Sequence, residues 1–159
     1  MESHPGRVTI LMADDDAEDR LLTVEAMQEA RVLNEFRFVS DGEELMDYLH
    51  RRGKYTGREE SPRPQLILLD LNMPRKDGRE ALWEIKSDPE LRRIPVVVLT
   101  TSTVDEDVLR SYDVGASAFM VKPVTFERLV EAMRALGRYW VEFVELPREE
   151  VYEPAQTRG

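Results

Sequence analysis

The sequence contains no cysteine and only two histidines, His4 and His50, in 159 residues. Without cysteine, a disulfide scaffold, a thiolate zinc site, an iron–sulfur cluster and a cysteine nucleophile are excluded. With two histidines we expect neither a catalytic triad nor a histidine-rich metal site. No apolar run approaches the ~18 residues of a membrane-spanning helix, and the run at 8–13 is too short for the core of a signal peptide. We therefore expect a cytoplasmic protein without membrane association.

Basic residues are outnumbered by acidic ones. Lys and Arg number 22 against 32 Asp and Glu, so the formal net charge is −10. Nucleic-acid binding through the whole surface would need clustered basic residues, and we expect no nucleic-acid partner. The length suits one domain with a real core. We expect that domain to span residues 7–146, with the Pro- and Glu-rich residues 147–159 as a flexible tail.

Apolar runs alternate with segments of helical periodicity along the chain. Strands are predicted at 8–13, 36–39, 66–69, 96–99 and 118–121, and helices at 17–30, after Asp41-Gly42, and at 79–87, 105–114 and 125–144. Residues 51–65 read as a long surface loop. Strands that alternate with helices indicate parallel pairing with right-handed crossovers. The predicted fold is α/β, a doubly wound five-stranded parallel sheet in the flavodoxin-like order 2-1-3-4-5, with an extended C-terminal helix.

Two of these helices have apolar residues at spacings of three and four, which predicts a buried face for each. In the first helix the predicted face is formed by Ala17, Leu21, Val24 and Met27. In the last helix it is formed by Phe126, Leu129, Val130, Met133 and Leu136.

Polar residues follow four of the predicted strands directly: Asp14-Asp15-Asp16, Asp70, Thr100 and Lys122. The carboxyl ends of parallel strands meet at one edge of a sheet, where such folds bind ligands. Carboxylates placed together repel one another unless a cation lies among them, and Mg²⁺, or Mn²⁺, suits an all-oxygen site. With a lysine and a hydroxyl, this is a phosphoryl-transfer arrangement. Each signal alone is weak, since acids after a strand also cap helices, as we expect of Asp16.

The sequence resembles a bacterial response-regulator receiver domain over residues 7–136. The resemblance rests on four motifs: Ile10-Leu11-Met12-Ala13-Asp14-Asp15-Asp16; Leu68-Leu69-Asp70-Leu71-Asn72-Met73-Pro74 with Asp77-Gly78; Val98-Leu99-Thr100; and Gly115-Ala116 leading to Val121-Lys122-Pro123. Together and in this order they are highly specific. The resemblance implies a signalling protein that takes a phosphoryl group from a sensor histidine kinase, and not an enzyme with a free substrate.

The resemblance also implies a role for each site residue. Asp70 is the implied phosphoacceptor, and Mg²⁺ is held by Asp15, Asp70 and the Asn72 carbonyl, with Asp14 acting through water. Thr100 is the implied switch hydroxyl and Lys122 the cation that pairs with the phosphoryl group. Phe119 occupies the aromatic switch position but lacks the hydroxyl of the alternative tyrosine.

Four features narrow the resemblance within receivers: Arg63-Pro64 before Leu68-Leu69-Asp70, Asp77-Gly78-Arg79-Glu80, the run from Ile94 to Ser102, and the aromatic C-terminal helix. In these the sequence is similar to the stand-alone regulators that are paired with bacterial phytochrome kinases. This narrower resemblance implies that the partner kinase is a bacteriophytochrome. The apolar character of the last helix continues past Gly137, where no sheet remains to cover it. Either this overhang folds back onto its own domain, or it forms an interface. We expect the second, a homodimer that buries Tyr139, Trp140 and Phe143.

Two alternatives from other classes remain open. A flavodoxin-like electron carrier would need a Ser/Thr/Gly-rich loop after the first strand, and three aspartates there would repel the phosphate of a flavin; we expect no flavin. A small Mg²⁺-dependent phosphohydrolase with Asp70 as nucleophile would need a second acid two residues later, where this chain has Asn72.

Overall fold

Five parallel strands form the centre of the computed structural model, which describes residues 9–32, 35–57, 59, 61–100, 105–122 and 125–138. The strands are β1 (Thr9–Ala13), β2 (Glu35–Val39), β3 (Leu66–Leu69), β4 (Val96–Thr100) and β5 (Ala118–Val121). They pair in the order β2-β1-β3-β4-β5, which confirms the predicted topology. Every described residue of β1, β3 and β4 is buried, as expected of strands covered on both faces.

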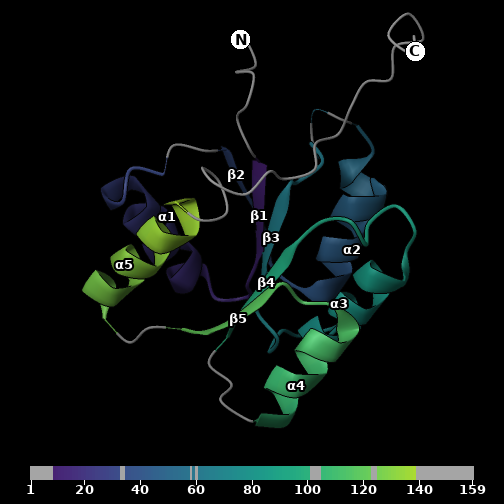
Figure 1. The fold of residues 1–159 in the computed structure, drawn as a ribbon. Helices are drawn as coiled ribbons and strands as arrows, with labels where there is room; N and C mark the ends of the chain where they lie inside the picture. Colours follow the sequence, from purple (N-terminus) through teal and green to yellow (C-terminus); the bar gives the residue numbers. More distant parts are fainter. Residues whose placement is uncertain are drawn as a thin grey trace, which may run out of the picture.

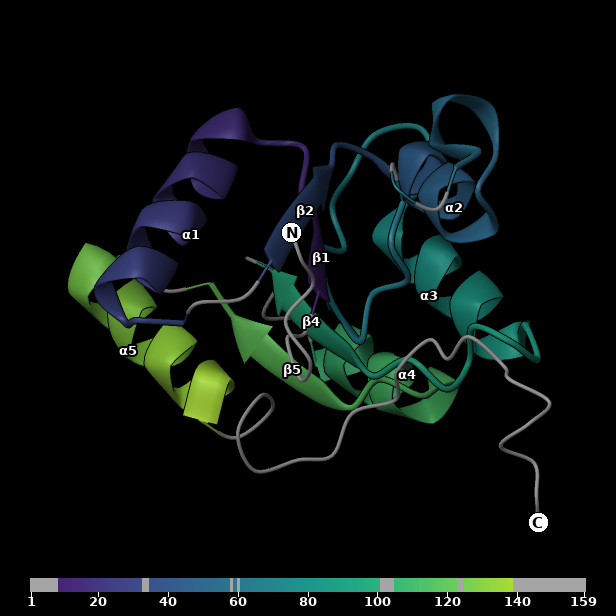
Figure 2. The same ribbon diagram turned by 90° about the horizontal axis from the view of Figure 1, so that it is seen from above.

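Helices cover both faces of the sheet. On one face lie α1 (Ala17–Glu29) and α5 (Phe126–Leu136); on the other lie α2 (Gly42–His50), α3 (Gly78–Ser87) and α4 (Asp105–Val114) (Figures 1 and 2). Successive side chains of a strand point to opposite faces. Leu11 and Ile67 accordingly pack under α2 and α3, and Ile10 and Leu68 pack under α1 and α5. The sheet thus separates two apolar cores.

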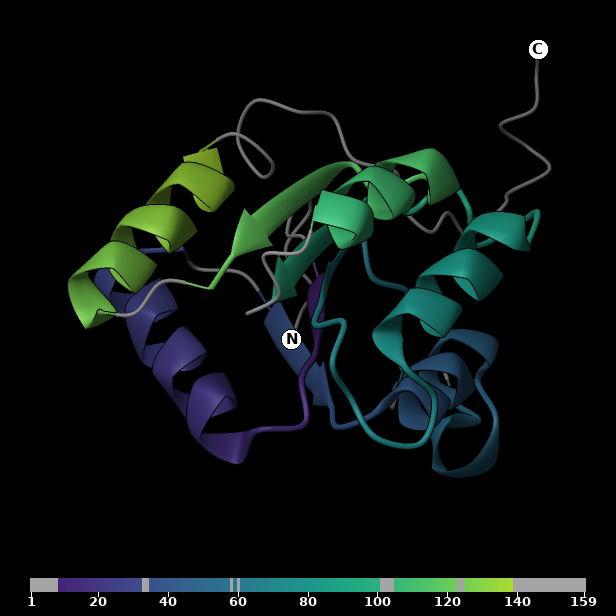
Figure 3. The same cartoon turned by 90° about the horizontal axis from the view of Figure 1, so that it is seen from below.

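The buried face of α1 differs from the prediction. Thr23, Ala26 and Met27 are its buried residues, whereas Leu21 is 58% exposed and Ala17 is also exposed. Apolar residues occur around most of this helix, so their spacing did not select one face. Packing against α5, beside which α1 lies (Figure 3), decides which residues are covered.

The last helix is predicted correctly in part. Thr125 caps it, because its Oγ1 accepts a hydrogen bond from the Arg128 backbone N–H at 3.2 Å, and Val130, Met133 and Leu136 are buried as predicted. Phe126 was expected in the core but is 40% exposed. With Leu22 it lines a pocket of about 110 Å³ between α1 and α5 that reaches Lys122. The helical backbone continues through Gly137 and Arg138, and the rest of the predicted helix, 139–144, lies outside the described residues.

The segment 51–65 is a loop, as predicted, and hydrogen bonds hold several of its described residues. It contains the 3-10 turn η1 (Gly53–Tyr55), and its Ser61 is buried and donates hydrogen bonds from Oγ to the carbonyls of Tyr55 and Gly57. The Tyr55 hydroxyl donates to the Glu44 carboxylate of α2. This loop is therefore tied to α2 by side-chain hydrogen bonds, which no sequence period reveals.

Gly78 brings α3 close to the end of β3. A Cβ at this position would lie 2.2 Å from the Asp70 carbonyl oxygen and 2.7 Å from Leu71 Cα. The Gly78 N–H donates to the Leu71 carbonyl at 2.9 Å, and Asp77 caps the helix by accepting from the Arg79 N–H. Only a residue without a side chain fits between these backbones, so glycine sets the position of α3 relative to Asp70.

Among the residues that the structure describes, no helix is both long and apolar enough to cross a membrane.

Candidate functional site

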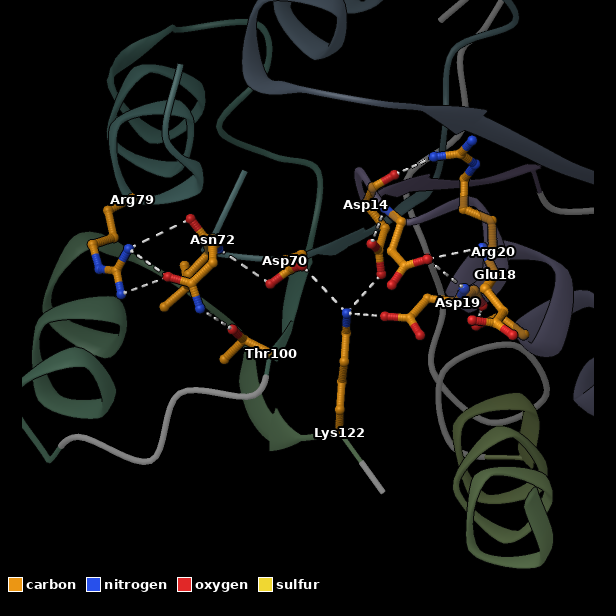
Figure 4. A network of polar contacts seen from close by, with 12 residues as sticks. Asp14, Glu18, Asp19, Arg20, Asp70, Asn72, Arg79, Thr100 and Lys122 are labelled. Carbon is orange, nitrogen blue, oxygen red and sulfur yellow. Dashed lines mark hydrogen bonds and ion pairs between the residues drawn. The ribbon is translucent and has the colours of Figure 1, made fainter. Parts of the chain in front are cut away.

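The polar residues at the strand ends converge at one edge of the sheet, as predicted. Asp14 follows β1, Asp70 follows β3, Thr100 ends β4 and Lys122 follows β5. Their side chains lie close together (Figure 4). Asp14, Asp70 and Thr100 are buried, at 0%, 6% and 0% exposed. Burial of two aspartates is unusual unless their carboxylates are paired.

Three carboxylates form a group that could hold a metal ion. Asp14, Asp15 and Asp70 each offer one oxygen, and these oxygens all lie within 4.8 Å of one another. Asp15 is the exposed member. Burial raises the pKa of Asp14 above its ordinary value, against the lowering effect of its hydrogen bond to Lys122. An all-carboxylate set fits a hard divalent cation such as Mg²⁺ or Mn²⁺.

The backbone around Asp14 fixes its carboxylate within this group. Asp14 Oδ1 accepts from the Asp16 N–H at 2.9 Å, and the Asp14 carbonyl accepts from Arg20 Nη1 at 2.6 Å. The Asp16 side chain accepts from the Glu18 and Asp19 backbone N–H groups. Asp16 is therefore the helix cap that the sequence predicted, and its neighbours belong to the acidic group.

Lys122 lies among carboxylates rather than in solvent. Its Nζ lies 2.8 Å from Asp14 Oδ2, 2.8 Å from Asp19 Oδ2 and 3.2 Å from Asp70 Oδ2. Burial works against the charged ammonium, but the hydrogen bonds to Asp14 and Asp19 and the nearby negative charges outweigh it and raise the pKa of Lys122. The side chain is a permanent cation within reach of the Asp70 oxygen.

On the other side of Asp70, Asn72 connects two elements. Its backbone N–H donates to Asp70 Oδ1 at 3.2 Å and its Nδ2 to Thr100 Oγ1 at 3.4 Å. Its amide oxygen accepts from the Arg79 guanidinium at 3.4 Å. The Asn72 carbonyl as a metal ligand stays a prediction. Phe119 is partly buried against the core under α2 and α3, on the neighbouring strand β5.

Among the residues of this network that sequence reasoning missed are Asp19 and Arg79. Asp19 lies in the first turn of α1, where an acid is commonplace because it interacts favourably with the helix N-terminus. Arg79 lies in the first turn of α3 and also pairs with Asp77 at 3.0 Å. No spacing rule distinguishes either residue from an ordinary surface charge. The predicted dimer residues, Tyr139, Trp140 and Phe143, lie outside the described residues.

Comparison with known proteins agrees with this geometry. The family model of the response regulator receiver domain matches residues 10–134. Response regulator Rcp1 of Synechocystis sp. is 42% identical over 146 residues, covering 92% of this chain and 97% of Rcp1.

Solved structures give the same result. The Mn²⁺-bound form of Rcp1 has a TM-score of 0.80 at 41% identity, covering 88% of this chain and 99% of Rcp1. The phosphorylated cyanobacterial phytochrome response regulator RcpA has a TM-score of 0.82 at 41% identity, covering 89% of this chain and 99% of RcpA. The motifs, the strand order and the acidic site match together, and this chain belongs to the response regulator receiver domain family.

Proposed function

We propose that this receiver accepts a phosphoryl group on Asp70 from the phosphohistidine of a sensor histidine kinase. The supporting observation is the environment of Asp70. Its Oδ2 is 3.2 Å from Lys122 Nζ, and its carboxylate lies with those of Asp14 and Asp15 in a group that could hold a metal ion. Asp14, Asp15 and Asp70 would hold Mg²⁺, with the Asn72 carbonyl. Bound Mg²⁺ neutralises charge on the phosphoryl oxygens.

The residues of the chain supply the other parts of the reaction. An Asp70 carboxylate oxygen forms the new O–P bond while the N–P bond of the phosphohistidine breaks, and the imidazole nitrogen keeps that electron pair. Lys122 pairs with a phosphoryl oxygen as charge develops there. The product is an aspartyl phosphate, and the protein has no free substrate to turn over. A phosphohydrolase is not favoured, because the Asn72 amide has no acidic proton to give to a leaving group, as a second carboxylic acid at this position would.

The signal is carried by Thr100 and Phe119. Thr100 leaves its hydrogen bond with Asn72 and moves toward the new phosphoryl oxygens, and Phe119 fills the space that is vacated. The face formed by α4, β5 and α5 has two conformations, and this local change in charge shifts the equilibrium between them. Phe119 has no hydroxyl, so the output does not depend on a hydrogen bond from that ring.

Phosphorylation is tested by intact mass after incubation with acetyl phosphate and Mg²⁺. The wild-type chain should gain one phosphoryl group and Asp70→Asn none. Asp47→Asn, which alters an exposed α2 carboxylate paired with Arg52, is the matched control and should be labelled normally. An Asp70→Asn protein that gains the same label rejects the assignment.

The partner kinase is a bacteriophytochrome. Support for this pairing comes from the likeness to the phytochrome response regulator RcpA and to the bacteriophytochrome response regulator RtBRR. Phosphotransfer from a panel of histidine kinases should be fastest from a bacteriophytochrome and should change between red and far-red light. A faster kinase of another class contradicts this pairing.

The protein is a cytoplasmic homodimer whose domain spans residues 7–146, with 147–159 as a tail. The aromatic residues Tyr139, Trp140 and Phe143 form the contact, since the sequence stays apolar after Gly137 and exposed apolar patches mark interfaces. Light scattering should give the mass of a dimer for the full chain and of a monomer for a chain that ends at Arg138. Equal masses would show that this segment does not hold the dimer together.

A further inference from the structure

The Lys122 ammonium has a third carboxylate partner, Asp19, 103 residues earlier in the chain. An ammonium group has three N–H donors and no acceptor. In this structure Nζ has three carboxylate partners: Asp14 and Asp19 at 2.8 Å and Asp70 at 3.2 Å. Figure 4 shows Nζ between Asp70 on one side and Asp19 on the other. Every donor of Lys122 therefore has an assigned acceptor.

The first turn of α1 carries Asp19. Its backbone N–H donates to the capping side chain of Asp16 at 3.4 Å, in the first turn of α1. Its carboxylate is not a member of the group of Asp14, Asp15 and Asp70. A cation bound there draws on the oxygens of Asp14 and Asp70, and Asp19 remains an acceptor for the lysine alone.

The direction of the Lys122 side chain must come from its acceptors. Lysine carries a compact charge on a flexible four-carbon stem, and the charge itself imposes no direction. With two N–H groups donated to Asp14 and Asp19, the third is left for the Asp70 side of the site. Without Asp19, the Lys122 ammonium keeps only one acceptor besides the phosphoacceptor Asp70. That acceptor is Asp14, which is also a candidate metal ligand.

A purely local role for Asp19 makes a different prediction. An acid in the first turn of a helix interacts favourably with the helix N-terminus whatever else it contacts. Glu18 lies in the same turn, is exposed, and its carboxylate has no ion pair or hydrogen bond within the described part of the chain. Glu18 therefore supplies the matched control.

We propose that Asp19 is a positioning residue for phosphoryl transfer, which holds the Lys122 ammonium so that one N–H faces the place where the Asp70 phosphoryl group forms. This inference rests on the proposed function. Asp19 touches neither the phosphoryl group nor the reacting oxygen, and it acts through Lys122.

The test measures the rate at which acetyl phosphate labels Asp70 in the presence of Mg²⁺. Asp19→Ala should slow labelling about tenfold, in the range expected when a reacting group is misplaced by a fraction of an ångström to an ångström. Asp19→Asn, whose amide oxygen still accepts a hydrogen bond, should recover most of the rate. Glu18→Ala should label like the wild type.

A double-mutant cycle decides whether Asp19 acts through the lysine. In a Lys122→Ala background, Asp19→Ala should cause no further loss, because two residues that act as a unit are not additive. The same fold-loss in both backgrounds overturns the inference, as does an Asp19→Ala rate equal to that of the wild type. If the wild-type chain gains no phosphoryl group, the proposed function fails and this inference with it.

A second readout does not depend on the reaction. The ¹⁵N ammonium resonance of Lys122, assigned by its loss in Lys122→Arg, should be sharp in the wild type and in Glu18→Ala because all three protons are hydrogen-bonded. It should broaden in Asp19→Ala through faster exchange with water. An equally sharp signal in Asp19→Ala shows that Asp19 does not hold the lysine.

Discussion

Replacing Gly78 by alanine should displace the start of α3 from the loop that carries Asp70. The new Cβ would lie 2.2 Å from the Asp70 carbonyl oxygen and 2.7 Å from Leu71 Cα, and real Cβ atoms essentially never approach closer than 3.0 Å. Both obstructing atoms are backbone, so neither can swing aside as a side chain does. The helix and the loop must move apart by most of an ångström.

The magnitude follows from two opposing effects. Overpacking costs about 1–3 kcal/mol, while alanine gains up to about 1 kcal/mol over glycine as a helix former. We expect the free energy of unfolding to fall by about 1–2 kcal/mol as the balance of these effects. The displacement also moves the Asp70 peptide, and a misplacement of this size lowers a phosphorylation rate by up to about 100-fold.

Urea unfolding and acetyl-phosphate labelling measure the two effects separately. Gly53→Ala is the control, because Gly53 has a φ of +61° and nothing within 4 Å of its added Cβ. Its left-handed backbone should cost about 1 kcal/mol of stability without changing the labelling rate. A Gly78→Ala protein with wild-type stability and rate would refute the argument that glycine sets the position of α3.

Three further changes test other parts of the structure. Asp15→Ala should weaken Mg²⁺ binding about tenfold or more, measured by calorimetry, and unchanged affinity would reject Asp15 as a ligand. Tyr55→Phe should lower the free energy of unfolding by about 1 kcal/mol near neutral pH through loss of the hydrogen bond to Glu44, as measured in urea. Leu82→Ala, in the core under α2 and α3, should cost about 2–5 kcal/mol in the same assay, and a loss under 1 kcal/mol would contradict its burial.

The Tyr55–Glu44 contact also predicts a pH dependence. Burial would raise the pKa of Glu44, but the hydrogen bonds from Tyr55 and Ser40 lower it overall. Its contribution is therefore present above pH 4.5 and is lost as the pH falls through the lowered pKa. Burial and the Glu44 contact raise the pKa of Tyr55 above 10.0. The unfolded chain then ionises first, and stability declines as the pH rises above 10. In Tyr55→Phe the alkaline decline should be shallower, and an unchanged slope contradicts the assignment.

The topology and the chemistry of one sheet edge could be predicted from the amino-acid sequence alone. Continuous apolar runs such as residues 66–69 are specified by local composition, and the runs that form β1, β3 and β4 are buried, whereas β5 is only partly buried. Alternation with helices implies parallel pairing, and parallel strands bring their carboxyl ends together. Asp14, Asp70 and Lys122 therefore meet because each directly follows a strand, which is a local property of the chain.

Contacts that depend on how helices pack, and on how side chains reach across the sheet edge, could not be predicted from the sequence. The covered side of α1 depends on α5, so Leu21 is exposed although its spacing predicted burial. Asp19 reaches Lys122 because α1 begins beside the end of β5, across a separation of 103 residues. The place of Tyr55 against α2 likewise comes from packing. Sequence periodicity records which residues share an element, whereas these contacts depend on the distances between elements.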